Sequence, residues 1–327
     1  MKIFVTGGAG YVGSIFLEKL TEAGHDAIVF DNLVQGHRAA FVPGVTFVHG
    51  DLADRDALDG VFRMHKIDGV VHFAGETLVG ESMTNPYLYF RKIVVYGLHL
   101  LETMRSNGVR NIVFSSTSAV YGEPHEVPIQ EEAAKEPLNA YGEAKHIFER
   151  ILHWYDFAHG FRYAALRYFN AAGATERNGE DHDPETHLIP LVLKVALGQR
   201  ECIHIFGTDY DTPDGTCIRS YTHVVDLASA HVLALENLDR IGSRCYNLGC
   251  RKGYSVHEVI EAARVVTGRD IPAIPTKRRP GDPSCLIASA ELIRRELGWE
   301  PEFPDIHSII QTAWDWHRRH PYGYGEE

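Results

Sequence analysis

The chain has 327 residues, of which 44% are hydrophobic. A chain of this length and composition can bury a large core, as one large domain or as a domain with a smaller portion attached. Its 32 Lys and Arg residues against 44 Asp and Glu give a formal net charge of −12. This charge argues against nucleic acid or an anionic membrane as the main partner.

The five cysteines are odd in number and show no CxxC spacing, which is typical of free thiols in a reducing compartment. The sequence runs directly into an apparent strand, and no apolar run is long enough to span a bilayer. These features predict a cytoplasmic protein.

Short apolar runs alternate with longer amphipathic segments through the first half of the chain. This pattern predicts the α/β class, with a doubly wound parallel sheet of the Rossmann type and helices on both faces. Strands are expected at residues 2–6, 27–30, 45–50, 69–75, 111–116 and 162–170, and helices at 11–24, 54–66, 86–107 and around 141–145.

After residue 175 the alternation gives way to a loop rich in charge, Gly and Pro, then to short strands and helices near 187–198, 224–238, 255–267 and 304–319. We expect residues 1–175 to form a dinucleotide-binding domain and residues 176–327 mainly a smaller, mixed α/β substrate-binding portion. Segments around 219–247 are expected to return to the first domain. The chain has no Gly/Ser linker, so the two portions are predicted to pack closely.

The motif TGGAGYVG places Gly7, Gly10 and Gly13 between the first strand and the first helix. Glycine permits the tight turn there and lets backbone N–H groups approach a pyrophosphate at the positive end of the helix. Asp31 ends the second strand, where a carboxylate would bind a ribose 2′-hydroxyl and repel a 2′-phosphate. The sequence therefore predicts a site for NAD in preference to NADP.

Two further turns fit the same cofactor. Asp51 and Leu52, in GDL, lie where a third strand would meet the adenine end of the dinucleotide. Phe73, Ala74 and Gly75 end a fourth strand with small residues that let the backbone pass close to a ligand.

The stretch NAYGEAK places Tyr141 and Lys145 four residues apart on one face of a predicted helix. A solvated lysine beside a packed tyrosine would explain the pair. The alternative is chemical, because a nearby cation favours the phenolate and suits a tyrosine that must lose its proton. Spacing alone leaves both explanations open.

TGGAGYVG, SSTSAVYG and YGEAK resemble motifs of the extended short-chain dehydrogenase/reductase superfamily. The resemblance implies that Tyr141 is the acid/base, that Lys145 lowers its pKa and holds the nicotinamide ribose, and that Thr117 hydrogen-bonds the reacting sugar hydroxyl. Ser116 is the nearest alternative to Thr117. Ser118 and Ala119 stand where dehydratases of the superfamily carry an acid, which favours hydride transfer without a second proton transfer.

Residues 205–231 (IFGTDYDTPDGTCIRSYTHVVDLASAH), LRYFNAAG, HLIP, RRPGDP and WDWHRRHPYGY resemble the UDP-galactose (UDP-glucose) 4-epimerase family. This resemblance implies a homodimeric enzyme that epimerises C4 of a UDP-hexose with tightly bound NAD. It implies sugar-nucleotide contacts from Asn170, His187, Leu188, His204, Phe206, Arg219, Tyr221, Arg279, Asp282 and Leu286, and further cofactor contacts from Tyr11, Val12, Asn32, Tyr168 and Phe169.

The chain departs from the family at three places. Thr77 stands where epimerases commonly carry a lysine or another polar contact, and Ile93 stands where they commonly carry an asparagine near the nicotinamide. Ser220 replaces an aspartate that would orient Arg219. Leu286, intermediate in volume, is expected at a wall of the sugar pocket, although an apolar residue there could also simply face the core.

Other functions stay open. The chain could epimerise a UDP-N-acetylhexosamine, UDP-pentose or UDP-uronate, act as an oxidoreductase that releases its cofactor, or sense nucleotide sugars without turnover. No metal site is expected, because no HxxxH or HxxEH pair falls on a clear helix.

Overall fold

A computed structural model of the chain describes residues 1–249, 252–279 and 282–325. In these residues the central sheet has seven parallel strands in the order β11-β6-β5-β4-β1-β2-β3. This confirms the predicted doubly wound α/β sheet. The strands are β1 (Lys2–Thr6), β2 (Asp26–Asp31), β3 (Thr46–His49), β4 (Gly69–His72), β5 (Asn111–Thr117), β6 (Arg162–Tyr168) and β11 (Arg244–Leu248).

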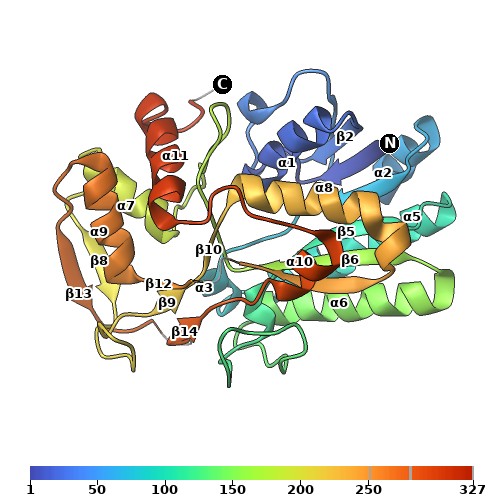
Figure 1. Cartoon of the computed structure of the whole chain (residues 1–327). Helices are drawn as coiled ribbons and strands as arrows, with labels where there is room; N and C mark the ends of the chain where they lie inside the picture. Colours follow the sequence, from blue (N-terminus) through green and yellow to red (C-terminus); the bar gives the residue numbers. More distant parts are fainter. Residues whose placement is uncertain (250–251, 280–281, 326–327) are drawn as a thin grey trace.

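Helices cover both faces of this sheet (Figure 1). On one face lie α1 (Tyr11–Glu22), α8 (Val224–Ile241) and α10 (Glu291–Leu297). On the other lie α2 (Arg55–Met64), α5 (Tyr96–Ser106) and α6 (Ala140–His159). From β1 the chain first adds β2 and β3 on one side and then crosses to add β4 on the other side. This reversal of strand order leaves a crevice at the carboxyl ends of β1 and β4, where ligands bind in folds of this type.

The predicted long helix at 86–107 is present but not uniform. It begins as α4 (Pro86–Tyr89), widens into a π-helical segment, η2 (Phe90–Val95), and continues as α5. Wide turns of this kind occur inside α-helices and are frequent at functional sites. The short helix α3 (Val79–Ser82) and helix α10 were not predicted.

The second portion of the chain packs around its own apolar core. Its strands pair as β7 (Asn170–Ala172) with β10 (Tyr221–His223), β8 (Ile203–Phe206) with β13 (Ala273–Thr276), and β9 (Ile218–Arg219) with both β12 (Tyr254–Ser255) and β14 (Cys285–Leu286). Its helices are α7 (Leu188–Ala196), α9 (Val256–Thr267) and α11 (Ile306–Arg319).

Cys202, Cys217, Cys245 and Cys285 are free thiols, and Cys250 lies outside the described residues. Within the part of the chain that the structure describes, no helix combines the length and apolar character needed to cross a membrane.

A buried ion pair ties α6 to the sheet. Arg167 of β6 donates two hydrogen bonds to the carboxylate of Glu149, at 2.8 and 2.7 Å, and each side chain is 4% exposed. Ser116 donates a third bond to Glu149, at 2.6 Å. Arg167 also donates to the hydroxyl of Tyr121, which in turn donates to Asn247 of β11. One polar network therefore joins α6 to three neighbouring strands.

We expect Glu149→Gln to lower the free energy of unfolding by about 3–5 kcal/mol, because it leaves the Arg167 guanidinium buried without a counter-charge. Burial alone would raise the pKa of Glu149, but Arg167 and the hydrogen bonds hold it below the ordinary 4.5. The contribution is therefore present above about pH 4.5 and should shrink as the pH falls below it.

Urea unfolding at several pH values measures this difference. Glu143→Gln is the matched control, since Glu143 lies on the same helix and its side chain makes no hydrogen bond or ion pair with the described residues. Equal stability of Glu149→Gln and the control at pH 7 would contradict the assignment.

Candidate functional site

A cavity of about 440 Å³ opens at the carboxyl ends of the central strands, against the second portion of the chain. Every residue that the sequence predicts for the cofactor lines it. They are Gly7, Gly10, Tyr11, Val12, Gly13, Asp31, Asn32, Asp51, Leu52, Phe73, Ala74, Gly75, Tyr141, Lys145, Tyr168 and Phe169.

The glycine turn is closely packed. A Cβ on Gly7, which has φ +71°, would lie 2.6 Å from the amide nitrogen of Ala74, and a Cβ on Gly13 would lie 2.2 Å from the carbonyl oxygen of Gly7. No side chain caps the N-terminus of α1, which starts after Gly10. Free N–H groups thus face the cavity at the positive end of a helix, an arrangement that fits a dinucleotide pyrophosphate.

Asp31 lies at the carboxyl end of β2, and its carboxylate is fixed by the backbone. It accepts hydrogen bonds from the amides of Ala9 (3.0 Å) and Leu33 (2.8 Å). Burial raises the pKa of Asp31, while these two bonds act to lower it. Asn32 donates to Asp51 at 2.7 Å, so both acidic residues lie at the same end of the cavity.

Thr117, Tyr141 and Lys145 converge on the cavity from β5 and the first turns of α6. Asn139 caps this helix by accepting a hydrogen bond from the amide of Gly142. The Nζ atom of Lys145 donates to the carbonyl oxygen of Ser115 at 2.7 Å and lies 5.9 Å from the centroid of the Tyr141 ring. The structure therefore brings together the three residues that the sequence predicts to react.

Burial is the largest influence on the pKa values of both Tyr141 and Lys145. It raises the pKa of Tyr141, against the lowering effect of the Thr117 hydroxyl. It also lowers the pKa of Lys145 to about 7, against the opposite effect of Glu149. The sequence predicts a tyrosine pKa lowered by Lys145, whereas burial in the folded chain raises the pKa of Tyr141.

Ser116, the alternative to Thr117, points away from the cavity. Successive side chains alternate across a strand, so Ser115 and Thr117 line the cavity while Ser116 donates its hydrogen bond to the buried Glu149. The structure thus favours Thr117 as the hydroxyl that faces a ligand.

The predicted substrate residues divide into two groups. Thr117, Asn170, His187, Arg219, Asp282 and Leu286 line the cavity. Its described wall does not include Leu188, His204, Phe206, Tyr221 or Arg279, whose roles stay predictions.

Two members of the second group lie together elsewhere. The guanidinium of Arg279 stacks over the ring of Phe206, 4.0 Å from its centroid. Tyr221, on β10, is buried in the apolar core of the second portion of the chain. The motif RRPGDP is described only in part, because Pro280 and Gly281 lie outside the described residues.

The position of Arg219 explains how the chain tolerates Ser220. The Nη2 atom of Arg219 donates to the carbonyl oxygen of Pro283 at 2.7 Å and lies 3.5 Å from a carboxylate oxygen of Asp282. Ser220 instead accepts a hydrogen bond from the amide of Ala288. A carboxylate therefore orients Arg219, but it comes from Asp282 rather than from position 220.

Sequence reasoning missed an ion pair at the cofactor end. Lys92, on η2, forms a salt bridge with Glu76, and both line the cavity beside Thr77. Ile93, the next residue on η2, is buried. Lys92 thus places a positive charge near Thr77, although position 77 itself carries no lysine. Only the course of the π-helical segment reveals this.

Sequence reasoning also missed Glu180 and His182, which line the cavity with His187. Burial alone would lower the pKa of His187, but Glu185 and Glu180 raise it to about 9. The spacing Glu-x-His-x-x-Glu-x-His over residues 180–187 was the available signal.

Comparisons with known proteins agree with this geometry. Residues 3–249 match the family model described as "NAD dependent epimerase/dehydratase family". A UDP-glucose 4-epimerase of Halalkalibacterium halodurans is 53% identical, over 100% of this chain and 98% of that protein.

Solved structures give the same result. A crystal structure of a UDP-glucose 4-epimerase matches with a TM-score of 0.97 and 49% identity, over 100% of both chains. The UDP-glucose 4-epimerase of Bifidobacterium longum, solved with NAD+ and UDP, matches with a TM-score of 0.95 and 38% identity, over 99% of this chain and 100% of that one. The chain therefore belongs to the NAD dependent epimerase/dehydratase family and, within it, to the UDP-glucose 4-epimerases, which are NAD-dependent isomerases.

Proposed function

We propose that the protein interconverts UDP-glucose and UDP-galactose in this cavity by reversible epimerisation at C4, with Thr117, Tyr141 and Lys145 as the catalytic residues. The observation that carries the proposal is the convergence of these three side chains on the cavity that also holds the glycine turn and Asp31. Two UDP-glucose 4-epimerases that are 53% and 51% identical to this chain over its full length support it.

In this mechanism the phenolate of Tyr141 takes the proton of the C4 hydroxyl, and Thr117 positions that hydroxyl by a hydrogen bond. NAD, held in this cavity, would supply a reversible hydride acceptor for C4, so that the 4-keto sugar can be reduced again on its other face. Tyr141 then gives the proton back. Lys145 would hold the nicotinamide ribose, and in its protonated form its charge would favour the phenolate.

The substrate diphosphate is held by planar donors. Arg219 is oriented toward the cavity by Asp282, and Asn170, which also lines the cavity, is anchored by donating to the carbonyl oxygen of Ser220 at 2.9 Å. Guanidinium groups suit phosphate oxygens because their donors are planar and paired. We assign the stacked Arg279 and Phe206 to the uridine end of the substrate.

An epimerase acting on another UDP-sugar is the second candidate. Leu286 both lines the cavity and packs against Val120, Tyr121 and Ile129, so the wall of the sugar pocket is apolar and only moderately bulky. Purified protein assayed across UDP-hexoses, UDP-N-acetylhexosamines, UDP-pentoses and UDP-uronates distinguishes the two. Turnover that is fastest outside the hexoses would replace the first proposal with the second.

The wider assignments follow from the same reaction. The chain would act in galactose metabolism in the cytoplasm, with residues 1–175 as the main NAD-binding domain and residues 176–327 as the main sugar-nucleotide portion. A homodimer built on the helices around 86–107 and 139–159 is supported by two exposed aromatic side chains on α6, Trp154 (58%) and Phe157 (79%). Covering apolar side chains of this size is favourable.

Tyr141→Phe should lower turnover by ~10² to 10⁴, because it removes the titrating proton and little apolar volume. NAD content and the unfolding midpoint should change little. Tyr155→Phe is the matched control, since Tyr155 lies on the same helix and donates its hydroxyl to Glu102, outside the cavity. Turnover of Tyr141→Phe within a few-fold of the control would refute the assignment.

Asp31→Ser should raise the affinity for NADP relative to NAD, because repulsion of the 2′-phosphate is lost. Bound cofactor measured after equilibration with both dinucleotides reports the change. Asp26→Ser, at the exposed start of the same strand, is the control. An unchanged preference in Asp31→Ser would show that another residue reads the 2′ position.

Leu286→Tyr should abolish epimerisation of UDP-N-acetylglucosamine and spare that of UDP-glucose. The parent chain should turn over the N-acetyl sugar measurably but more slowly, since apolar pockets discriminate small changes in volume by only ~1–3 kcal/mol. Parallel assays of both substrates test this. Equal loss of both activities would mean that the tyrosine disrupts the packing around Val120 and Ile129, and would refute the role of Leu286 in limiting the size of the sugar.

A further inference from the structure

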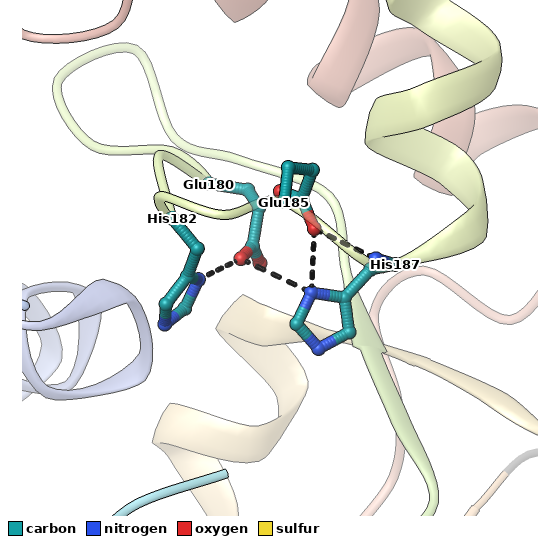
Figure 2. A group of neighbouring side chains, drawn as sticks. All are labelled: Glu180, His182, Glu185 and His187. Atoms are coloured by element: carbon teal, nitrogen blue, oxygen red, sulfur yellow. Dashed lines mark hydrogen bonds and ion pairs between the residues drawn. The ribbon is translucent and has the colours of Figure 1, made fainter. Parts of the chain in front are cut away.

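Four metal-ligating side chains gather in the loop between β7 and α7. Glu180, His182, Glu185 and His187 each offer one ligand atom, and these atoms all lie within 4.8 Å of one another. Figure 2 shows the carboxylate of Glu180 between the two imidazoles, with Glu185 against His187. None of these residues is needed for the proton transfer assigned to Tyr141.

The separations of the ligand atoms suit a small cation. Nδ1 of His187 lies 2.8 Å from Oε1 of Glu185 and 3.6 Å from Oε1 of Glu180, and Nδ1 of His182 is hydrogen-bonded to the same Glu180 oxygen. Ligand atoms of a tetrahedral Zn²⁺ site lie about 3.4 Å apart, given bond lengths of about 2.0–2.2 Å. Small side-chain adjustments would bring this set to that geometry.

The charge balance of the cluster is compatible with a bound cation. The side chains of Glu180 and Glu185 are only 6% and 3% exposed. Within the described parts of the chain, the ion-pair partners of these two carboxylates are the two histidines, with no lysine or arginine. Buried carboxylates need a counter-charge. Two protonated histidines can supply it, and so can one divalent cation bound by the two carboxylates and two neutral imidazoles.

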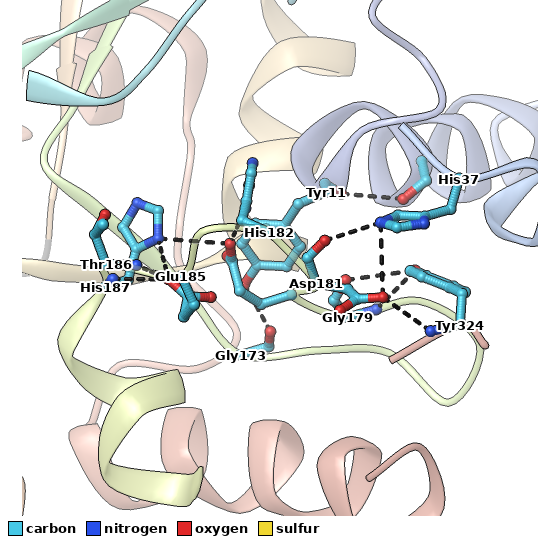
Figure 3. Close-up of polar contacts among 12 residues, drawn as sticks. Tyr11, His37, Gly173, Gly179, Asp181, His182, Glu185, Thr186, His187 and Tyr324 are labelled. Atoms are coloured by element: carbon cyan, nitrogen blue, oxygen red, sulfur yellow. Dashed lines mark hydrogen bonds and ion pairs between the residues drawn. The ribbon is translucent and has the colours of Figure 1, made fainter. Parts of the chain in front are cut away.

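The surrounding contacts hold the loop in place on both sides (Figure 3). On one side, Tyr324 accepts a hydrogen bond from the amide of Gly179 and donates its own amide to Asp181, and His37 bonds to the carbonyl oxygen of Asp181. On the other, Glu185 accepts hydrogen bonds from the amides of residues 186 and 187. These contacts hold the loop in place, and the backbone fixes the carboxylate of Glu185 directly.

We propose that Glu180, His182, Glu185 and His187 bind one Zn²⁺ ion. Two imidazoles with two carboxylates in a four-coordinate cluster suit Zn²⁺ better than Mg²⁺ or Ca²⁺, which take oxygen ligands in larger numbers. Four protein ligands close the coordination sphere, so the ion is structural. It fixes the part of the cavity wall that Glu180, His182 and His187 form.

The alternative is a pair of Glu–His ion pairs that need no metal. Untagged protein, stripped with a chelator and dialysed against equimolar Zn²⁺, should retain about one zinc per chain by elemental analysis. Co²⁺ in place of Zn²⁺ should give the intense visible absorption of a tetrahedral site. Added Zn²⁺ should also raise the unfolding midpoint of the stripped protein.

The variants E180Q and H182Q, singly and together, should lose the bound metal and the midpoint shift while keeping similar side-chain volumes. H37Q is the matched control, because His37 bonds to the same loop without facing the cluster. Wild-type protein that retains no zinc and gives no Co²⁺ spectrum would overturn the proposal, whether or not the variants fold. Retention of zinc by the double variant would overturn it as well.

The metal measurements are independent of the proposed epimerase activity. Turnover assayed on the same samples separates the two, since zinc binding without turnover would contradict only the proposed function, and turnover without zinc binding would contradict only the metal site.

Discussion

The geometry of the reactive groups depends on the buried ion pair between Glu149 and Arg167. Glu149 lies one turn beyond Lys145 on α6, and Ser116, which it also binds, precedes Thr117 on β5. The helix that carries the tyrosine and lysine is thereby fixed to the strand that carries the threonine. Because a buried charge without its partner is costly, α6 cannot slide along the sheet without losing this pair, and Thr117, Tyr141 and Lys145 keep their relative positions.

The cavity is built by two different kinds of structure. One wall consists of strand ends and helix starts of the central sheet, where the dinucleotide cradle lies. The other is made by short strands and loops of the second portion. There Leu286 of β14 is paired with Arg219 of β9, so an apolar and a cationic side chain of the cavity wall are neighbours in one small sheet. Under the proposed function, this arrangement would separate the parts that hold the cofactor from the parts that select the sugar.

Local patterns in the sequence were sufficient for the alternating strands and helices, the glycine turn, and the spacing of Tyr141 and Lys145. Features that depend on distant contacts were not accessible in this way. Asp282 orients an arginine 63 positions earlier in the chain, and no periodicity encodes that contact. Likewise, periodicity says nothing about the direction of side chains in the loop at 180–187, so the sequence pointed to His187 as a substrate contact but not to its neighbours Glu180 and His182. Burial also reversed the expected direction of the Tyr141 pKa, because desolvation depends on the whole fold.

The π-helical segment η2 has a consequence for helical phase. Tyr89, Ile93 and Leu101 are buried, and Gly97 lies against Phe148, so the inward residues recur every four positions. In a regular α-helix each step of four overshoots a full turn by about 40°, and three steps would rotate the last residue about 120° away from the first. The wider turn of η2 absorbs part of this rotation and keeps the series directed at the core. With Ile93 held inward, the preceding residue, Lys92, is left on the side of the helix that borders the cofactor cavity.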